Sequence, residues 1–327
     1  MPALSRRRIV IGQGWTAVSQ SSIWGSIRHR WSMIQYAWRH YRTMYLFMLP
    51  FFSLFLVFVV GPVLTAIYLS FSYYNMLEPP RWIGLSNYRL LFLEDDIFLI
   101  AVKNTLIFSI ITGPLGYSIS FILAWFINRL KLKQVYTLAF YAPSIISAIA
   151  MSVIWLYLFA NDRYGVLNYL LIEIGLITEP IAWLQEQSTI MPVIILISLW
   201  MSMGTSFLVF LAGLQSVPME LYEAGMVDGI QNSMQEVFYI TLPVMRPQLL
   251  FGAVMAIVNS FAVFQVAAQV SGVPSPLYAG HTIVAHLYMH AFINFEMGYA
   301  SAIAVVLFLA TFILGRVAMR LLSERGS

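Results

Sequence analysis

Two amides and one indole stand inside long apolar stretches of the sequence, where they could contact a hydroxylated solute. Asn259 and Gln265 lie in one stretch and Trp200 lies in another. Amides donate and accept hydrogen bonds, and an aromatic ring can stack on the apolar face of a sugar ring. Polar groups in membrane helices also join helices through hydrogen bonds, which contribute about 0.6 kcal/mol on average. Both roles stay open for each residue, and we predict that Trp200, Asn259 and Gln265 line a translocation path.

Three histidines, His281, His286 and His290, are a second group that could do chemistry. The last two are four positions apart, which places them on one face of a helix, and imidazole is a common metal ligand. No acid or further ligand lies at a matching helical spacing. We therefore expect no metal site in this chain.

The sequence lacks the patterns of an enzyme and of a proton-driven carrier. No GxxxxGK[ST] loop is present, so we expect no nucleotide or other cofactor to bind to this chain. We find no nucleophile paired with a base, and we predict no catalytic residue. Nor does an ionisable side chain lie in the middle of an apolar stretch, where a secondary carrier normally keeps its proton relay.

Residues 216–247 form a polar island between two apolar stretches, and their capping pattern predicts two short helices. Pro218 fits the first helical turn, where its missing N–H costs little. Glu223 lies early in this helix, where the helix dipole favours negative charge. Asp228 and Gly229 predict its end, because glycine readily adopts the left-handed conformation of a C-terminal cap.

The second short helix is predicted to begin at a capping box. Asn232 can accept from the backbone three residues on, and Gln235 can reach back to the N-cap N–H. We expect this helix to end near Leu242, because Pro243 follows.

Composition identifies an integral membrane protein. Hydrophobic residues make up 60% of the 327 positions and charged residues only 10%, against about 25% charged residues in soluble proteins. Cysteine is absent, so neither disulfides nor thiolate sites are available.

We predict an all-α, polytopic bundle of about six spans in one membrane domain, residues 46–322, after a basic segment, residues 1–45. The approximate spans are 45–71, 102–127, 135–160, 190–214, 249–270 and 297–321. The shorter segment 165–177 is expected to be interfacial or re-entrant. The segment 281–295 is expected to lie on the outer side of the membrane.

The distribution of positive charge orients these spans. With six spans, 14 of the 18 Lys and Arg residues fall on the side of the N-terminus. The positive-inside rule therefore places both termini and residues 216–247 in the cytoplasm. The later half of residues 1–45 is rich in Arg and Trp, which predicts a helix on the anionic inner membrane surface. We expect no nucleic-acid partner.

Two stretches carry a resemblance to a known family. The runs Glu223-Ala224-Gly225, Asp228-Gly229 and Ile240-Thr241-Leu242-Pro243 together resemble the EAA loop of membrane subunits of binding-protein-dependent ABC importers, in the sugar-permease branch. Residues 289–308, MHAFINFEMGYASAIAVVLF, are similar to the last-span signature of the larger or first membrane subunit. The likeness extends over about residues 45–322. It departs from the family at Gly225, where alanine is usual, and at residues 271–274, which replace a glycine-rich turn.

The resemblance implies a fold, a location and a set of partners. The fold would be the type I ABC importer permease fold, in the bacterial cytoplasmic (inner) membrane. The implied partners are a second, different permease subunit, two ATPase subunits that bind ATP and Mg²⁺, and an extracytoplasmic solute-binding protein. The residues implied to couple this chain to the ATPase are Glu223, Ala224, Gly225, Asp228, Gly229, Leu242 and Pro243.

The resemblance also implies a sugar or oligosaccharide as substrate. Alternatives are another polar solute such as glycerol phosphate, an acidic oligosaccharide, or a different class of protein, a stand-alone secondary carrier. Phosphate is usually bound by Arg or Lys, and the middles of the predicted spans hold neither. This observation favours a neutral sugar.

Overall fold

The computed structural model describes residues 40–202 and 204–323, which are almost entirely helical. This part of the chain divides between Leu64 and Thr65 into two compact units, and each is described by itself. A surface helix is predicted in the later half of residues 1–45. The part of this segment up to residue 39 lies outside the described residues.

The first unit is helical from His40 and belongs to the candidate span His40–Ser70. Within it, Leu56–Val60 form a π turn, η1, and the N–H of Gly61 donates to the carbonyl of Leu56. Pro62 has no N–H, and its ring would crowd the carbonyl four residues earlier in a regular helix. The wider turn relieves that contact. The helix of the first span is therefore irregular just before Gly61-Pro62.

Five helices in the described residues are long and apolar enough to cross a membrane, or six spans if a bent pair of helices counts as one. The pair is α5 (Lys133–Ile145) and α6 (Ala148–Leu158), whose axes differ by 97°. Pro143 lies near the end of α5 and Ile146 is extended, so the chain cannot continue as one helix. The prediction of about six spans is confirmed, with the third one broken. The five unbroken candidates are His40–Ser70, Asp96–Asn128, Gln187–Ser216, Arg246–Ser271 and Met297–Arg320.

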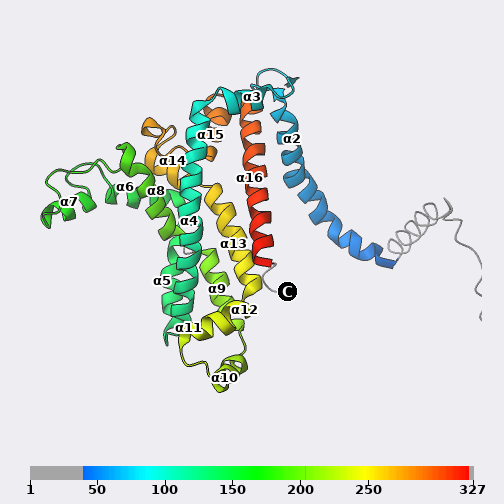
Figure 1. The fold of residues 1–327 in the computed structure, drawn as a ribbon. Coiled ribbons are helices and arrows are strands. Elements are labelled where there is room, and N and C mark those ends of the chain that lie inside the picture. Colours follow the sequence, from blue (N-terminus) through cyan, green and yellow to red (C-terminus); the bar gives the residue numbers. More distant parts are fainter. Residues whose placement is uncertain (1–39, 203, 324–327) are drawn as a thin grey trace, which may run out of the picture. The chain divides into compact units, whose positions relative to one another are not determined.

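A helical bundle forms the core of the second unit (Figure 1). Its members are α4 (Asp96–Asn128), α8 (Gln187–Met201), α9 (Thr205–Ser216), α13 (Arg246–Phe261) and α16 (Met297–Ser323). Helix α4 packs against α8, α9 and α13, and α13 also packs against α16. A Cβ at Gly252 of α13 would lie 2.6 Å from the ring of Phe210 on α9. The missing side chain therefore lets the two helices approach closely, as is common between membrane helices.

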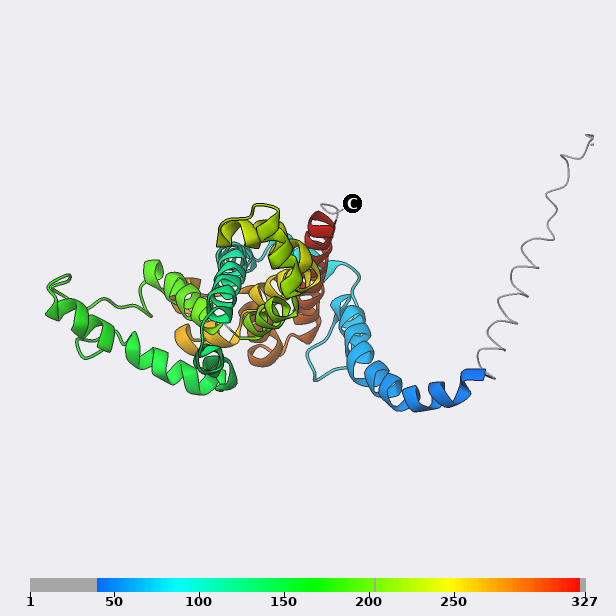
Figure 2. The ribbon, with the colours of Figure 1, turned by 90° about the horizontal axis from the view of Figure 1, so that it is seen from below.

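Shorter helices surround this bundle. Figures 1 and 2 both show α6 and α7 (Val166–Glu173) on the side away from α16. Helix α7 ends before the predicted limit, Ile177, because the chain turns at Gly175, whose φ is +72°. The outer segment predicted for residues 281–295 contains α15 (Ile283–Tyr288) and the π turn η4 (Met289–Ile293). The remaining short elements after α13 are α14 (Gln265–Ser271) and the 3-10 helix η3 (Pro276–Tyr278).

A small hairpin and a short helix lie at the same end of the bundle as α15 (Figure 1). Strands β1 (Ser72–Tyr73) and β2 (Arg81–Trp82) pair antiparallel, and α3 (Ser86–Leu93) follows them. The buried amide of Asn87 donates to the carbonyls of Ser70 (2.9 Å) and Ser72 (3.0 Å). One side chain thus joins α3 to the end of α2 (Gly61–Ser70) and to β1.

The start of α16 touches this hairpin at a glycine. The N–H of Gly298 donates to the carbonyl of Tyr74 at 3.1 Å. A Cβ at Gly298 would lie 2.1 Å from the carbonyl oxygen of Ser72, which is a backbone atom and cannot rotate away. Glycine is therefore required here by a close approach of two backbones.

We expect the substitution Gly298→Ala to destabilise the protein by about 1–3 kcal/mol or more, because overpacking forces the backbone to shift. Gly315→Ala is the matched control in the same helix, since a Cβ there meets nothing within 4 Å. The control should be neutral or slightly stabilising, because alanine is the better helix former by about 1 kcal/mol. Thermal unfolding of both full-length variants in detergent measures the difference, and equal melting temperatures would contradict the packing argument.

Candidate functional site

Residues 216–247, which we call the elbow, lie at the end of the bundle opposite α3 and α15 (Figure 1). Its first helix, α10, spans Met219–Val227 and stops at Asp228, with Gly229 at φ +94°. The predicted helix end is thus confirmed. Pro218 precedes the helix as its N-cap and does not belong to its first turn, so that prediction is wrong by one residue. Its extended ψ of 135° lets the chain change direction between α9 and α10.

The second part of the elbow starts as predicted but continues further. The Asn232 side chain accepts from the N–H of Gln235 at 2.9 Å, and the capping box is complete. Helix α11 (Ser233–Glu236) then passes through the π turn η2 (Val237–Thr241) into α12 (Leu242–Val244). The helix ends at Val244, close to the expected end near Leu242, but Pro243 lies inside it and is not what ends it. The N–H of Leu242 donates to the carbonyl of Val237, five residues back, and this wider turn leaves room for Pro243 in the first turn of α12.

Gly225 is buried where the two halves of the elbow meet. A Cβ at this position would lie 2.7 Å from Cδ1 of Ile240 and 3.0 Å from Cδ1 of Ile230. Tyr222 reinforces the contact, because its hydroxyl lies 3.0 Å from the hydroxyl of Thr241. Glycine at this position thus lets the Ile240 side chain pack closely against α10.

Arg129, at the C-terminal end of α4, ties the elbow to the bundle. Its guanidinium forms an ion pair with Glu236 at 2.6 Å and donates to the hydroxyl of Ser233. It also lies over the ring of Trp125, 4.6 Å from the centroid. These contacts fix α11 against the end of the longest helix in the bundle.

The buried side of the elbow is continuous with the core of the bundle. Val217, Ile240 and Met245 belong to one buried cluster together with Phe207 and Phe210 of α9. The cluster also contains Ala124 and Ile127 of α4 and Leu211 and Leu214 of α9. The elbow therefore packs as part of the bundle and is not a loose loop.

The other side of the elbow presents apolar side chains to the surroundings. Val227 is 88% exposed, Met219 65% and Met226 56%, and all three lie on α10. Glu223 and Ala224, on the same short helix, are also exposed. An exposed apolar patch next to an acid is typical of a surface that binds another protein. We call these five residues the docking face.

A cavity of about 310 Å³ lies between α4, α8, α9 and α13. Its wall is rich in hydroxyl groups and includes the amide of Asn259. The polar residues that line it are Thr112, Tyr117, Ser120, Ser144, Ser198, Ser202, Thr205, Ser206, Asn259 and Ser260. The described residues of the wall include no acidic or basic side chain. Such a wall can form hydrogen bonds with a neutral, hydroxylated solute.

The three residues predicted to line a path fall in three places. Asn259 lines the cavity just described, whereas Gln265 lines a second hollow with Gln269 and Tyr288. Trp200 is not among the described residues lining either hollow. Its ring packs edge-on against Trp155 with centroids 5.3 Å apart. The structure does not bring these three together.

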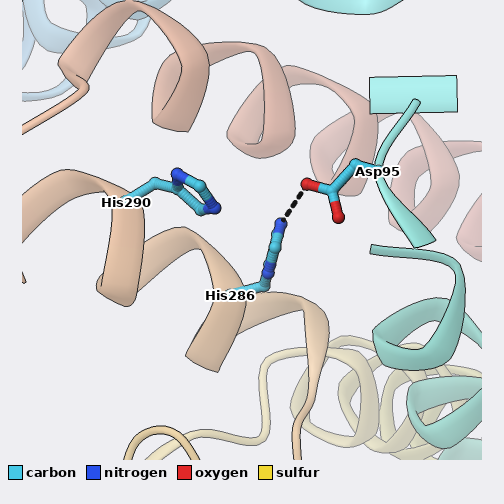
Figure 3. Close-up of side chains that lie close together, drawn as sticks. All are labelled: Asp95, His286 and His290. Atoms are coloured by element: carbon cyan, nitrogen blue, oxygen red, sulfur yellow. Dashed lines mark hydrogen bonds and ion pairs between the residues drawn. The ribbon is translucent and has the colours of Figure 1, made fainter. Parts of the chain in front are cut away.

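The histidines meet an acid that the sequence analysis missed. Nε2 of His286 lies 3.0 Å from a carboxylate oxygen of Asp95, the N-cap of α4, at the end of the bundle opposite the elbow (Figure 3). The same oxygen accepts a 2.5 Å hydrogen bond from the hydroxyl of Tyr299. Asp95 is 191 positions from His286, so helical spacing could not have revealed the contact.

Burial and hydrogen bonding set the charges in this cluster. Burial lowers the pKa of His286, and Asp95 opposes that effect only in part. Burial likewise lowers the pKa of His281 to about 4. Burial would raise the pKa of Asp95, but hydrogen bonds from Tyr299 and from the N–H of Phe98, together with His286, hold it below its usual value. At neutral pH, His281 and His286 are therefore neutral and Asp95 is a carboxylate.

Comparison with known proteins gives consistent results along most of the chain. Residues 116–325 match the family described as binding-protein-dependent transport system inner membrane component. The chain is 37% identical to the probable ABC transporter permease protein YesP of Bacillus subtilis, over 80% of this chain and 84% of YesP. It is 32% identical to the arabinooligosaccharides transport system permease protein AraP of Bacillus subtilis, over 85% of this chain and 87% of AraP.

Comparison with solved structures identifies the fold of the chain. One match is the crystal structure of a bacterial ABC transporter involved in the import of the acidic polysaccharide alginate. One of its chains superposes with a TM-score of 0.76 at 23% identity, and the match covers 91% of this chain and all of that one. The predicted permease fold is confirmed.

Proposed function

The chain belongs to the binding-protein-dependent transport system inner membrane components, and from this membership we propose that it forms half of a translocation path for a sugar or oligosaccharide. It is thus a multi-pass inner-membrane permease subunit of an ABC importer and not itself catalytic. The other half would be a second, different permease subunit. Two ATPase subunits would bind ATP and Mg²⁺, and an extracytoplasmic binding protein would deliver the solute.

The elbow is the proposed contact with an ATPase. It would lie on the cytoplasmic side of the membrane, as would both termini of the chain. The observation that carries this proposal is the two-sided character of the elbow. Its buried side shares a core with α4 and α9, while the docking face is exposed. Glu223 would provide the electrostatic contact, and Met226 and Val227 the apolar one. Ala224 would be part of the docking face, and the buried Gly225 would let the two halves of the elbow pack. Asp228 and Gly229 would set the angle of the turn between them. Leu242 and Pro243 would connect the elbow to α13.

Coupling follows from this arrangement by rigid packing. When ATP closes the ATPase pair, the docked elbow moves with it, and the shared core and Arg129 transmit the motion to α4 and α9. The path would then open to the outside, and hydrolysis would return it to the inside. Transport requires that the solute bind the two states with different affinity.

The cavity wall favours a neutral, hydroxyl-rich solute. Asn259 and the surrounding hydroxyl groups could bind sugar hydroxyls, and the described wall has no Lys or Arg for a phosphate or carboxylate. AraP is named for arabinooligosaccharides, a solute of this class. Gln265 would extend the polar surface into the second hollow, and a role for Trp200 in the path stays a prediction.

Purification and reconstitution test the proposed function. The tagged chain, extracted in mild detergent, should copurify with a second permease and an ATPase. In proteoliposomes the whole complex should accumulate a sugar only when binding protein and ATP are both supplied, and this chain alone should transport nothing. Transport by this chain alone would contradict the proposal and favour a stand-alone carrier.

A further inference from the structure

We propose that Asp95, His286 and His290 form a binding site for a divalent transition metal, with Zn²⁺ as the best fit, at the end of the bundle opposite the elbow. The sequence predicts no metal site because no acid lies at helical spacing from the histidines. The fold removes that reason, since it brings the carboxylate of Asp95 to them from a distant part of the chain (Figure 3). The proposal does not depend on the identity of the transported solute.

The geometry of the three side chains carries the proposal. One ligand atom from each residue lies within 4.8 Å of the other two, and Nε2 of His286 is 3.0 Å from Asp95. The rings of His286 and His290 have centroids 4.5 Å apart, as expected for residues one turn apart on a continuous helix. Zinc binds imidazole nitrogen and carboxylate oxygen at about 2.0–2.2 Å, so ligand atoms around a tetrahedral ion are about 3.3 Å apart. Small side-chain rotations would bring all three into that range.

The groups behind the histidines are those that orient metal ligands. Nδ1 of His290 lies 2.6 Å from a carboxylate oxygen of Glu296, and Nδ1 of His286 lies 3.3 Å from Nε2 of His281. Each imidazole thus has its Nδ1 held by another side chain, which leaves Nε2 for the ion. Carboxylate and similar partners on the remote nitrogen of a metal-bound histidine fix its tautomer and strengthen its basicity.

Access also suits a bound cation. The His286 side chain is fully buried, while the side chains of Asp95 and His290 are each 14% exposed. An ion could therefore enter beside Asp95 and His290. Three protein ligands would leave a fourth position for water.

A metal here would join two segments that are far apart in the sequence, the start of α4 and the continuous helix Ile283–Ile293. Asp95 caps α4, His286 lies on α15 and His290 lies on η4, just before α16. The hydroxyl of Tyr299 on α16 already donates to Asp95. The site would therefore hold the end of α4 against the segment that leads into the last span.

Metal binding by the purified full-length chain tests the proposal directly. The chain, carrying an affinity tag without histidines, is dialysed against buffered Zn²⁺, and bound zinc is counted by mass spectrometry. We expect about one zinc per chain in the parent protein and a loss of that zinc in His290→Ala and in His286→Ala. Glu94→Gln is the matched control, because it removes the exposed acid adjacent to Asp95 and should leave the zinc content unchanged.

A second variant keeps the test decisive if a histidine substitution disturbs folding. The side chain of Glu296 is 52% exposed, so Glu296→Gln should fold normally. It should weaken zinc binding by about 10- to 100-fold, as expected on loss of a partner that orients a ligand. Substitution with Co²⁺ should give the visible absorption of a tetrahedral site in the parent chain and not in His290→Ala. Equal zinc content in the parent and both histidine variants, or none in the parent, would overturn the proposal and leave a hydrogen-bonded cluster only.

Discussion

Replacing Glu223 with lysine is expected to release the ATPase subunits from the complex and to reduce solute uptake to background. Glu223 is exposed on α10 beside apolar side chains of the docking face. Truncating one member of a buried charge pair at an interface costs about 2–5 kcal/mol, and reversing the charge adds repulsion. The affinity for the ATPase should fall by roughly 30-fold or more. Copurification of the ATPase with the tagged chain, followed by uptake into proteoliposomes, measures both effects.

The control for this prediction is Glu173→Lys. Glu173 is also an exposed acid on a short helix, α7, but it lies outside the elbow. This variant should insert, assemble and transport as the parent does. Full assembly and transport in Glu223→Lys would refute the proposed docking role, whereas loss in both variants would point to a general effect of the added lysine.

Asn259→Leu is expected to lower uptake by about 2- to 10-fold while leaving the complex assembled. Leucine has the same number of side-chain heavy atoms as asparagine and the same branch at Cγ, so the helix should still pack, but the cavity would lose an amide. One lost hydrogen bond to a bound solute costs about 0.5–1.5 kcal/mol, and about 1.4 kcal/mol corresponds to a factor of ten. Uptake of labelled sugar into proteoliposomes that contain the full complex measures the loss, with ATPase copurification as the check on assembly.

Thr311→Val is the matched control for the cavity. Thr311 lies in α16, its hydroxyl donates to backbone carbonyls of its own helix, and it is not among the residues that line the cavity. Removing that hydroxyl should leave uptake unchanged. Unaltered uptake in Asn259→Leu would mean that this amide serves helix packing, which is the alternative that the sequence leaves open.

Local signals predict much of the elbow correctly. The capping box of Asn232 and Gln235 and the turn at Gly229 depend on a few neighbouring residues, so the sequence contains nearly all the information needed. The continuation of the helix through Pro243 is not predictable from neighbouring residues. A π turn that accommodates a proline is favoured by the packing of Val237 and Ile240 into the core, which only the folded bundle reveals.

Long-range contacts are the part that the sequence cannot predict. Asp95 reaches His286, and Arg129 reaches Glu236, across 191 and 107 positions, respectively. A single sequence gives no register between elements that far apart, so neither pair was open to prediction. The same limit explains why Asn259, Gln265 and Trp200, which share a chemical character, lie in different parts of the fold.

The central claim is that the elbow contacts the ATPase on the cytoplasmic side. The chain has no cysteine, so Ala224→Cys introduces a single thiol on the exposed side of α10. A photoreactive group attached there should crosslink to the ATPase subunit in the working complex, and a group on Glu173→Cys should not. Two results would contradict the account. One is labelling of the Ala224→Cys variant by a membrane-impermeant reagent added outside intact cells. The other is the absence of a crosslink from position 224 in an actively transporting complex.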